Sequence, residues 1–359
     1  MTSLFSSYYN IIMLGKKFLT KACLSTYSMQ FSALEARQRI IATLALEKGK
    51  NNLVQKAGTE GINPEIAKHY SLLSTAFNAA ARQGAAKFQM AYDETRPLSR
   101  RNTDKTFQEA LIRLYDDRGE AVYPDALFDA LDNADQDGEA GRQARLWFTI
   151  SQIREFYRTH QPNEALSLNI SAADMRNPSY RDGLEETLKL AGQNGFKNLI
   201  LEALEQSPWG VDESQALRSF RDKYGVKIAI DDYGAPDGFH TANTLVLLSP
   251  DIVKLDGHAV RNFIEKDNKT IFTRLEEVEK ICPEALVVAE WVSSAEDASL
   301  LMTEGKKHFW AHRIDIIQGQ NIIENEREFL HHLAKLKKQE TSPAPAEETM
   351  FCPPIFQPV

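Results

Sequence analysis

Short apolar runs alternate with longer amphipathic stretches along most of the chain, which is the pattern of alternating strands and helices. The runs that we interpret as strands are Leu166–Ile170, Leu199–Leu201, Val226–Ile230, Ile252–Leu255 and Leu286–Ala289. Apolar residues recur at helical spacing between them, for example in Gly141–Tyr157, Tyr180–Ala191 and Ala259–Ile281. This alternation predicts a mostly parallel sheet, either doubly wound or closed as a barrel. No glycine-rich nucleotide loop follows the early strands, which disfavours the dinucleotide-binding form of the open sheet.

The chain divides into four predicted parts. We expect a flexible N-terminus over residues 1–30, a helical extension over 31–85, the strand–helix domain over 86–338 and a disordered tail over 339–359, where five prolines occur without periodicity. The extension should hold two helices. The second begins near Asn63-Pro64, since Asn is a good N-cap and Pro suits the first turn. Packing onto the main domain is the favoured role for this pair, ahead of dimerisation or sensing.

Charge and cysteine content limit the partners and the compartment. The net charge is -8, so nothing general attracts the chain to DNA or to an anionic membrane. The three cysteines, Cys23, Cys282 and Cys352, are far apart and predict neither a disulfide framework nor a zinc site. A short apolar run near the N-terminus is too short to span a bilayer. These features favour a cytoplasmic protein without stable membrane insertion.

Polar residues able to bind metal stand at the ends of the predicted strands. They are Asn169, Glu202, Asp231, Asp232, Lys254, Asp256 and Glu290, with Glu109 in an earlier segment. Strand C-termini converge on one face of a β/α barrel, and buried carboxylates repel one another unless a cation compensates. Oxygen ligands favour Mg²⁺ or Mn²⁺, and adjacent aspartates suit a two-metal site for phosphoester hydrolysis. One such carboxylate alone would be read as a helix cap; the whole set predicts a metal site.

The same residues lie in a series of short motifs: Glu109-Ala110-Leu111, Asn169-Ile170-Ser171, Glu202-Ala203-Leu204-Glu205, Asp231-Asp232-Tyr233-Gly234, Lys254-Leu255-Asp256, Ala289-Glu290-Trp291-Val292-Ser293 and Gln318-Gly319. These motifs resemble those of the EAL family of cyclic-di-GMP phosphodiesterases. Their order and rough spacing agree with the family over about residues 86–335. The resemblance implies an α/β fold, a modified TIM (β/α)₈ barrel of the EAL type whose first strand runs antiparallel to the others.

The resemblance also implies a role for each residue. Glu109, Asn169, Glu202 and Asp231 would hold the first of two ions, and Asp231, Asp232 and Glu290 the second ion and its water. Lys254 would contact and help to activate that water, with Asp232 and Glu290 as its catalytic neighbours. Arg113, Leu111 and Gln318 would bind the substrate, with Arg113 on a phosphate. Asp256 and Gln318 would orient this shell, and Glu205 would anchor the loop that follows Asp231-Asp232.

Three features depart from the family pattern. The loop GAPDGFHTANTL after the aspartate pair is about two residues longer than usual. Ser293 replaces the second glutamate of the AEGVE motif, and Trp291 replaces its glycine. The Trp291 side chain could crowd the site or stack on guanine, although a position in the core is the favoured interpretation. A longer segment precedes Gln318 and contains His308 and His312, which we interpret as ordinary polar positions rather than metal ligands.

The function that follows is metal-dependent hydrolysis of cyclic-di-GMP to the linear dinucleotide pGpG. Two alternatives remain: a catalytically silent receptor for cyclic-di-GMP, favoured by the altered loop and Ser293, and a protein-interaction module. The retained acidic set argues against the last, because unused carboxylates would destabilise the barrel. The resemblance also allows a homodimer, although no surface in the sequence identifies one.

Overall fold

The computed structural model describes residues 30–45, 88–97, 106–115, 121–122, 139–266, 270–307 and 314–318 of the chain. Its strands are β1 (Phe88–Pro97), β2 (Gln108–Tyr115), β3 (Ala121–Val122), β4 (Leu166–Ile170), β5 (Leu199–Ala203), β6 (Lys227–Tyr233), β7 (Ile252–Leu255), β8 (Leu286–Ala289) and β9 (Ile314–Gln318). Its helices are α4 (Glu139–Thr159), α5 (Ala172–Arg176), α6 (Pro178–Gln193), α7 (Val211–Tyr224), α8 (Ala242–Leu248), α9 (Gly257–Lys266), α10 (Thr270–Ile281) and α11 (Ala295–Lys307). Residues 30–45 form a further helix.

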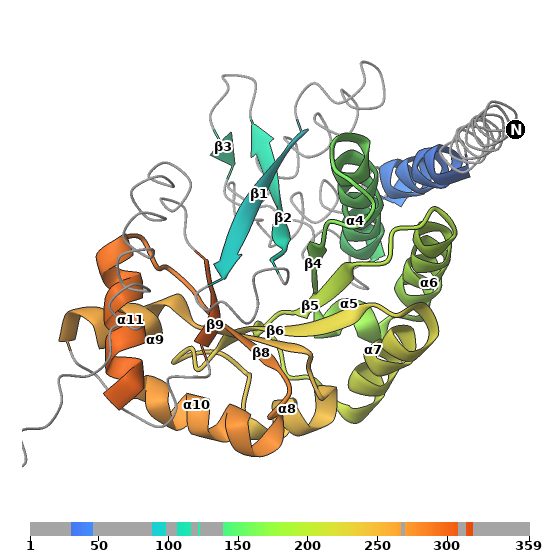
Figure 1. Ribbon diagram of the computed structural model, residues 1–359. Coiled ribbons are helices and arrows are strands. Elements are labelled where there is room, and N and C mark those ends of the chain that lie inside the picture. The colour runs from blue at the N-terminus through green and yellow to red at the C-terminus, as the bar shows by residue number, and fades with distance from the viewer. Residues whose placement is uncertain are drawn as a thin grey trace, which may run out of the picture.

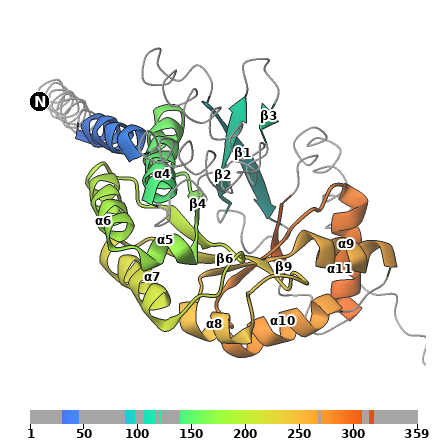
Figure 2. The same cartoon turned by 180° about the vertical axis from the view of Figure 1, so that it is seen from behind.

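The strands close into a barrel. Neighbouring strands pair in parallel from β2 through β4, β5, β6, β7 and β8 to β9, and β1 pairs antiparallel with both β9 and β2. The short β3 lies outside the ring, on β2. The modified (β/α)₈ barrel is therefore confirmed, including the antiparallel first strand. Figures 1 and 2 show the helices along the outer side of this sheet, with α6, α7, α8, α10 and α11 in succession.

The predicted elements agree closely with the observed ones. Three predicted strands have the observed bounds, and β5 and β6 extend two and three residues further toward the site. The predicted helical stretch 259–281 is two helices, α9 and α10, with residues 267–269 outside the described residues. Predictions for residues 1–29, for the helix starting near Asn63, for His308 and His312 and for the tail likewise fall outside them. Within the described part of the chain, no helix combines the length and apolarity that crossing a bilayer requires.

Local sequence explains where the helices around the site begin and end. Ser171 accepts the Asp174 N–H at the start of α5, and Asn177 caps α6 ahead of Pro178 in the first turn. Helix α7 ends at Gly225, whose φ of 68° lies in the left-handed region that glycine adopts without strain. These turns return the chain to the next strand of the barrel.

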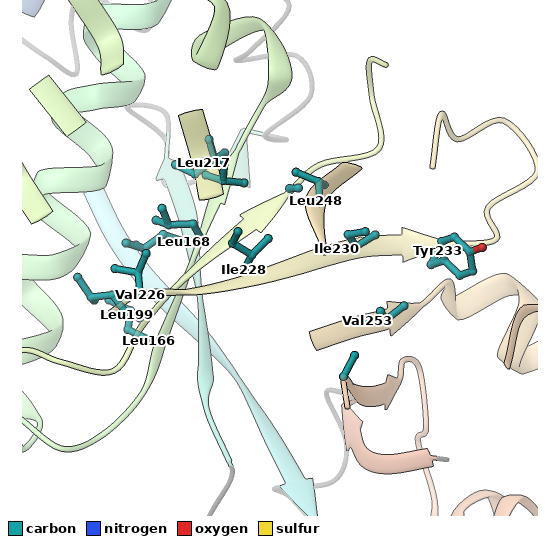
Figure 3. Close-up of a cluster of buried hydrophobic side chains, with 14 of the residues drawn as sticks. Leu166, Leu168, Leu199, Leu217, Val226, Ile228, Ile230, Tyr233, Leu248 and Val253 are labelled. Atoms are coloured by element: carbon teal, nitrogen blue, oxygen red, sulfur yellow. The ribbon is translucent and has the colours of Figure 1, made fainter. Parts of the chain in front are cut away.

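Most of the apolar core lies between the strands and the surrounding helices. Figure 3 shows part of it: Leu168 and Leu199, Ile228 and Ile230 from neighbouring strands meet Leu217 and Leu248 from helices α7 and α8. All are buried. Alternate residues of the same strands point the other way, into the barrel, because side chains alternate between the two faces of a strand.

The helix over residues 30–45 packs on α4, beside which it lies in Figures 1 and 2. Glu35 is buried and accepts hydrogen bonds from Trp147 Nε1 at 3.0 Å and Arg154 Nη1 at 2.7 Å. Gln38 donates to the side chain of Gln143 at 2.5 Å. The helix over residues 30–45 therefore packs onto α4 of the barrel. Ile40 and Leu44, by contrast, remain exposed.

The Glu35 contacts give a test of this packing. We expect Glu35→Ala to lower the free energy of unfolding by about 1–3 kcal/mol, because the buried Trp147 N–H loses its acceptor. Urea denaturation followed by circular dichroism measures the change. Glu155→Ala is the matched control, since Glu155 forms only an exposed pair with Arg158 and should cost less than about 1 kcal/mol. Equal losses in the two variants would show that the helix is not anchored through Glu35.

Candidate metal centre

The barrel interior has an apolar layer and, one step further along the strands, a polar layer. Phe107, Ile200, Ala229, Ile252, Val288 and Ile316 form the apolar layer. Two residues after each of these come Glu109, Glu202, Asp231, Lys254, Glu290 and Gln318, and Asn169 follows Ser167 in the same way. Residues two apart lie on the same face of a strand. The strand register therefore gathers seven polar side chains, referred to below as the polar layer, at one level of the barrel.

Lys254 lies at the centre of the polar layer. Its side chain is 1% exposed, and its Nζ contacts four carboxylates from four different strands or strand ends. The contacts run to Glu202 at 2.5 Å, Glu290 at 2.7 Å, Asp231 at 2.8 Å and Glu109 at 3.0 Å. An ammonium group has only three protons to donate, so these four carboxylates share one cation.

Amide and hydroxyl groups orient the carboxylates. Glu109 accepts from Asn169 Nδ2 at 3.1 Å and from Gln318 Nε2 at 2.8 Å. Ser167 donates to Glu202 at 2.5 Å. The oxygens of both amides, Asn169 Oδ1 and Gln318 Oε1, are buried without a hydrogen-bond partner. Buried polar atoms are normally paired, so two unpaired oxygens in one layer point to a missing electropositive partner.

The pKa directions show that negative charge is in excess. Burial, with Glu109 nearby, raises the pKa of Glu202 well above its usual value, and burial does the same to the pKa of Glu290. Burial opposes the charged form of Lys254, but the carboxylates outweigh it and raise its pKa, so the ammonium persists. Burial would also raise the pKa of Asp231, yet contact with Lys254 lowers it. One lysine therefore neutralises only part of the cluster.

The polar layer fits a divalent cation. Its oxygen ligands come from carboxylates and amides. Such ligands favour Mg²⁺, Mn²⁺ or Ca²⁺ over Zn²⁺. A cation would also supply the charge that otherwise has to come from protons on Glu202 or Glu290. The predicted first-ion residues Glu109, Asn169, Glu202 and Asp231 are thus brought together, and both the unpaired amide oxygen of Asn169 and the charge excess suit an ion there.

A second group of carboxylates lies next to the polar layer. Oxygen atoms of Glu205, Asp231 and Asp232 lie within 4.8 Å of one another, which is compatible with a shared metal ion. Burial, with Asp231 nearby, raises the pKa of Asp232 to about 6, and burial raises the pKa of Glu205 to about 7. The pairing of β6 with β7 shifts register between Ile230 and Tyr233, and Asp232 has a left-handed φ of 45°. This irregularity lets both adjacent aspartates approach the same group.

The loop after β6 is tied to this group. The Glu205 carbonyl accepts the Phe239 N–H at 3.0 Å, and the Asp231 carbonyl accepts from His240 Nδ1 at 2.6 Å. Burial lowers the pKa of His240, which favours the neutral ring. Glu205 was predicted to anchor this loop; its backbone contact fits that role, while its carboxylate faces the aspartates. Sequence reasoning missed His240 and Ser167. Inward alternation along β4 could have indicated Ser167, whereas no spacing signal marks His240.

The remaining predicted residues lie around the polar layer. Asp256 Oδ1 accepts the Ala259 N–H at 2.9 Å and so caps α9. Leu111 is half-buried in β2 opposite Ala91 of β1, and Arg113 lies two residues further along β2, with its side chain outside the described residues. Their substrate-binding roles stay predictions.

Two departures from the family pattern lie just beyond β8. Ser293 donates from Oγ to Asp297 Oδ2 at 3.0 Å. The favoured interpretation of Trp291 as a core residue is wrong, because the side chain is 50% exposed. The residue directly follows buried Glu290, and its left-handed φ of 54° keeps it out of the regular strand direction.

Comparisons with known proteins agree with this architecture. The family model of the EAL domain matches residues 80–322. Among solved structures, the FimX EAL domain from Pseudomonas aeruginosa bound to c-di-GMP is 20% identical, with a TM-score of 0.54 over 71% of this chain and 94% of that one. The YkuI protein of Bacillus subtilis, in complex with substrate c-di-GMP and calcium, is 17% identical, with a TM-score of 0.55 over 74% and 65%.

A third structure, the PaMucR phosphodiesterase in a c-di-GMP complex, is 16% identical, with a TM-score of 0.55 over 71% of this chain and 96% of that one. At these identities the likeness shows the fold alone. Among curated proteins, none has a sequence found to match this chain.

The shared lysine gives a test of the charge balance. We expect Lys254→Met to lower the free energy of unfolding at pH 7 by about 3–5 kcal/mol without divalent ions, because buried carboxylates lose their counter-charge. Millimolar Mn²⁺ should raise the thermal midpoint of this variant more than that of the unaltered protein. Differential scanning calorimetry measures both effects.

Lys223→Met is the matched control for that experiment. Lys223 pairs with Glu185 on the exposed surface, so its loss should cost less than about 1 kcal/mol and should not change the response to Mn²⁺. If Lys254→Met were as stable as this control, the cluster would not depend on a cation.

Proposed function

Because the chain belongs to the EAL domain family, we propose that it is a phosphodiesterase that hydrolyses cyclic-di-GMP to the linear dinucleotide pGpG with two divalent ions, Mg²⁺ or Mn²⁺. The observation that carries the proposal is the convergence of four carboxylates and two unpaired amide oxygens around buried Lys254. EAL domains in general use divalent metals, and one similar protein, YkuI, is described with calcium and c-di-GMP.

Two sets of residues would hold the ions. Glu109, Asn169, Glu202 and Asp231 would hold the first, and Asp231, Asp232 and Glu290 the second. Glu205 joins the second set as an additional candidate, since its carboxylate lies with those of the aspartates. Bound there, two cations lower the pKa of a water and neutralise charge that develops on the phosphoryl oxygens.

The chain's own residues position that water and take up its proton. The Lys254 ammonium, held charged by its carboxylates, would turn one N–H from a carboxylate to the oxygen of the attacking water when those carboxylates bind the ions. The carboxylate of Asp232, one of the residues that the resemblance assigns to catalysis, would accept the proton. The new P–O bond forms as the bond to the leaving 3′ oxygen breaks, and that oxygen gains a proton, so one water is added overall.

The substrate would lie across the open end of the polar layer. Arg113 would pair with a phosphate through its two-pronged guanidinium, and Leu111 and Gln318 would contact the ligand nearby. The ligand is anionic and the protein carries a net charge of -8, so cations in the polar layer account for its attraction. A cytoplasmic location and a homodimer are further parts of this proposal.

One observation favours a second function, that of a catalytically silent receptor for cyclic-di-GMP. Ser293 replaces an acidic residue of the family motif, and its hydroxyl pairs with Asp297 of α11 instead of entering the polar layer. A receptor would bind the dinucleotide with metal but release no linear product.

Conversion of cyclic-di-GMP, followed by chromatography with Mg²⁺ or Mn²⁺, tests the proposal. Glu109→Gln keeps the side-chain size but removes the charge, and we expect it to lower kcat/KM by at least about 100-fold, since even outer partners of metal ligands cost about 10–100-fold. Glu155→Gln, on the exposed side of α4, should leave the rate unchanged.

The outcomes separate the two functions. Linear product that is lost in Glu109→Gln supports the phosphodiesterase. Metal-dependent binding of cyclic-di-GMP without product would replace it with the receptor, and an absence of both would refute each.

A further inference from the structure

Trp291 occupies the rim of the polar layer, although a left-handed backbone makes that position costly for a bulky residue. Its φ is 54°, and half of its side-chain surface is exposed. Strained backbone of this kind persists only where surrounding structure holds it, and it often occurs at binding sites. A large aromatic side chain that is both strained and exposed contributes little to the core, so its position calls for another explanation.

The indole is held in a fixed place. One side packs on Gly257, where a Cβ atom would lie 2.3 Å from the ring, and the His258 ring lies edge-on to the indole at 4.4 Å between centroids. Gly257 opens helix α9 directly after β7, so the floor beneath the indole belongs to a neighbouring strand end. Only the absence of a side chain at Gly257 leaves room for the ring.

The backbone on both sides of Trp291 is tied down as well. Before it, Glu290 contacts Lys254 in the polar layer. After it, the Val292 N–H donates to the Gln318 carbonyl at 3.1 Å. Ser293 N–H and Oγ both donate to Asp297, which also binds Arg261 of α9 at 2.7 Å. Trp291 is thus a rigid aromatic surface rather than a loose loop residue.

We propose that Trp291 is a base-stacking residue, and that its exposed indole face binds one purine base of the dinucleotide whose phosphate lies over the polar layer. The inference rests on the proposed function, and it deepens it by adding a residue that determines base affinity. An indole face stacks on any nucleobase, and such contacts are sequence-tolerant. Because Trp291 follows Glu290 directly, one ligand can place a phosphate at the ion held by Glu290 and a base on the indole at the same time.

Isothermal titration of cyclic-di-GMP into the full chain with saturating Ca²⁺ tests this inference at equilibrium. Trp291→Leu should lower the affinity for the dinucleotide roughly 5- to 150-fold, which corresponds to the loss of one stacking contact. Trp291→Phe should retain most of the affinity, because it keeps an aromatic face. Ile40→Ala, which shortens an exposed apolar side chain on the distant helix 30–45, is the control and should bind as the unaltered protein does.

A second titration, with Ca²⁺ alone, separates stacking from a structural effect on Glu290. Weaker dinucleotide binding by Trp291→Leu, with unchanged Ca²⁺ affinity and rescue by Trp291→Phe, supports the inference. Equal dinucleotide affinity in all variants overturns it and leaves the proposed function intact. A parallel loss of Ca²⁺ affinity also overturns it, because Trp291 would then only support the metal ligands. If the unaltered protein binds no cyclic-di-GMP, both the inference and the proposed function fall.

Discussion

The single ammonium of Lys254 shared among four carboxylates is the constraint on which the site depends. Each carboxylate comes from a different strand or strand end, so the lysine links β2, β5, β6 and β8 at one level of the barrel. Removing such charges from water costs on the order of several kcal/mol for each ion. Only close, well-oriented contacts between the charges offset this cost. The hydrogen bonds from Asn169, Ser167 and Gln318 supply that orientation, at the same level.

The apolar layer beneath makes this concentration of charge possible. Ile200, Ala229, Ile252 and Val288 fill the barrel one step before the polar layer and exclude water from below. The two layers follow from the two-residue period of a strand. A polar residue two positions after an apolar one points to the same face of the strand, so the polar layer forms directly above the apolar layer. A one-residue slip of any strand would exchange its inward and outward residues, so the register that builds the barrel also builds the site.

Strands β4 to β8, their parallel pairing and the polar residues that end them were accessible from sequence, because apolar runs and the residues that end them are local signals. The strands that carry Glu109 and Gln318 were not among the predicted apolar runs. Contacts made by loops were not. His240 reaches the Asp231 carbonyl from within a loop of unusual length, and neither spacing nor composition marks it. Trp291 was misjudged for a related reason: aromatic residues are usually buried, whereas this one is half exposed on a left-handed turn and packs against Gly257, which is distant in sequence. The domain limits and the roles of Arg113 and Leu111 stay predictions.

The excess of carboxylates has a consequence for how ligand and ion depend on each other. Without a second cation, raised pKa values at Glu202 and Glu290 favour bound protons, so an incoming divalent ion must displace them. With an ion in place, the same layer would change from repelling a phosphodiester to attracting it. An acidic chain would thereby gain affinity for an anion only where its carboxylates are most crowded, and the proposed binding of the anion would depend on the metal. This coupling holds for a phosphodiesterase and for a receptor alike, because it arises from the charge balance and not from the chemical step.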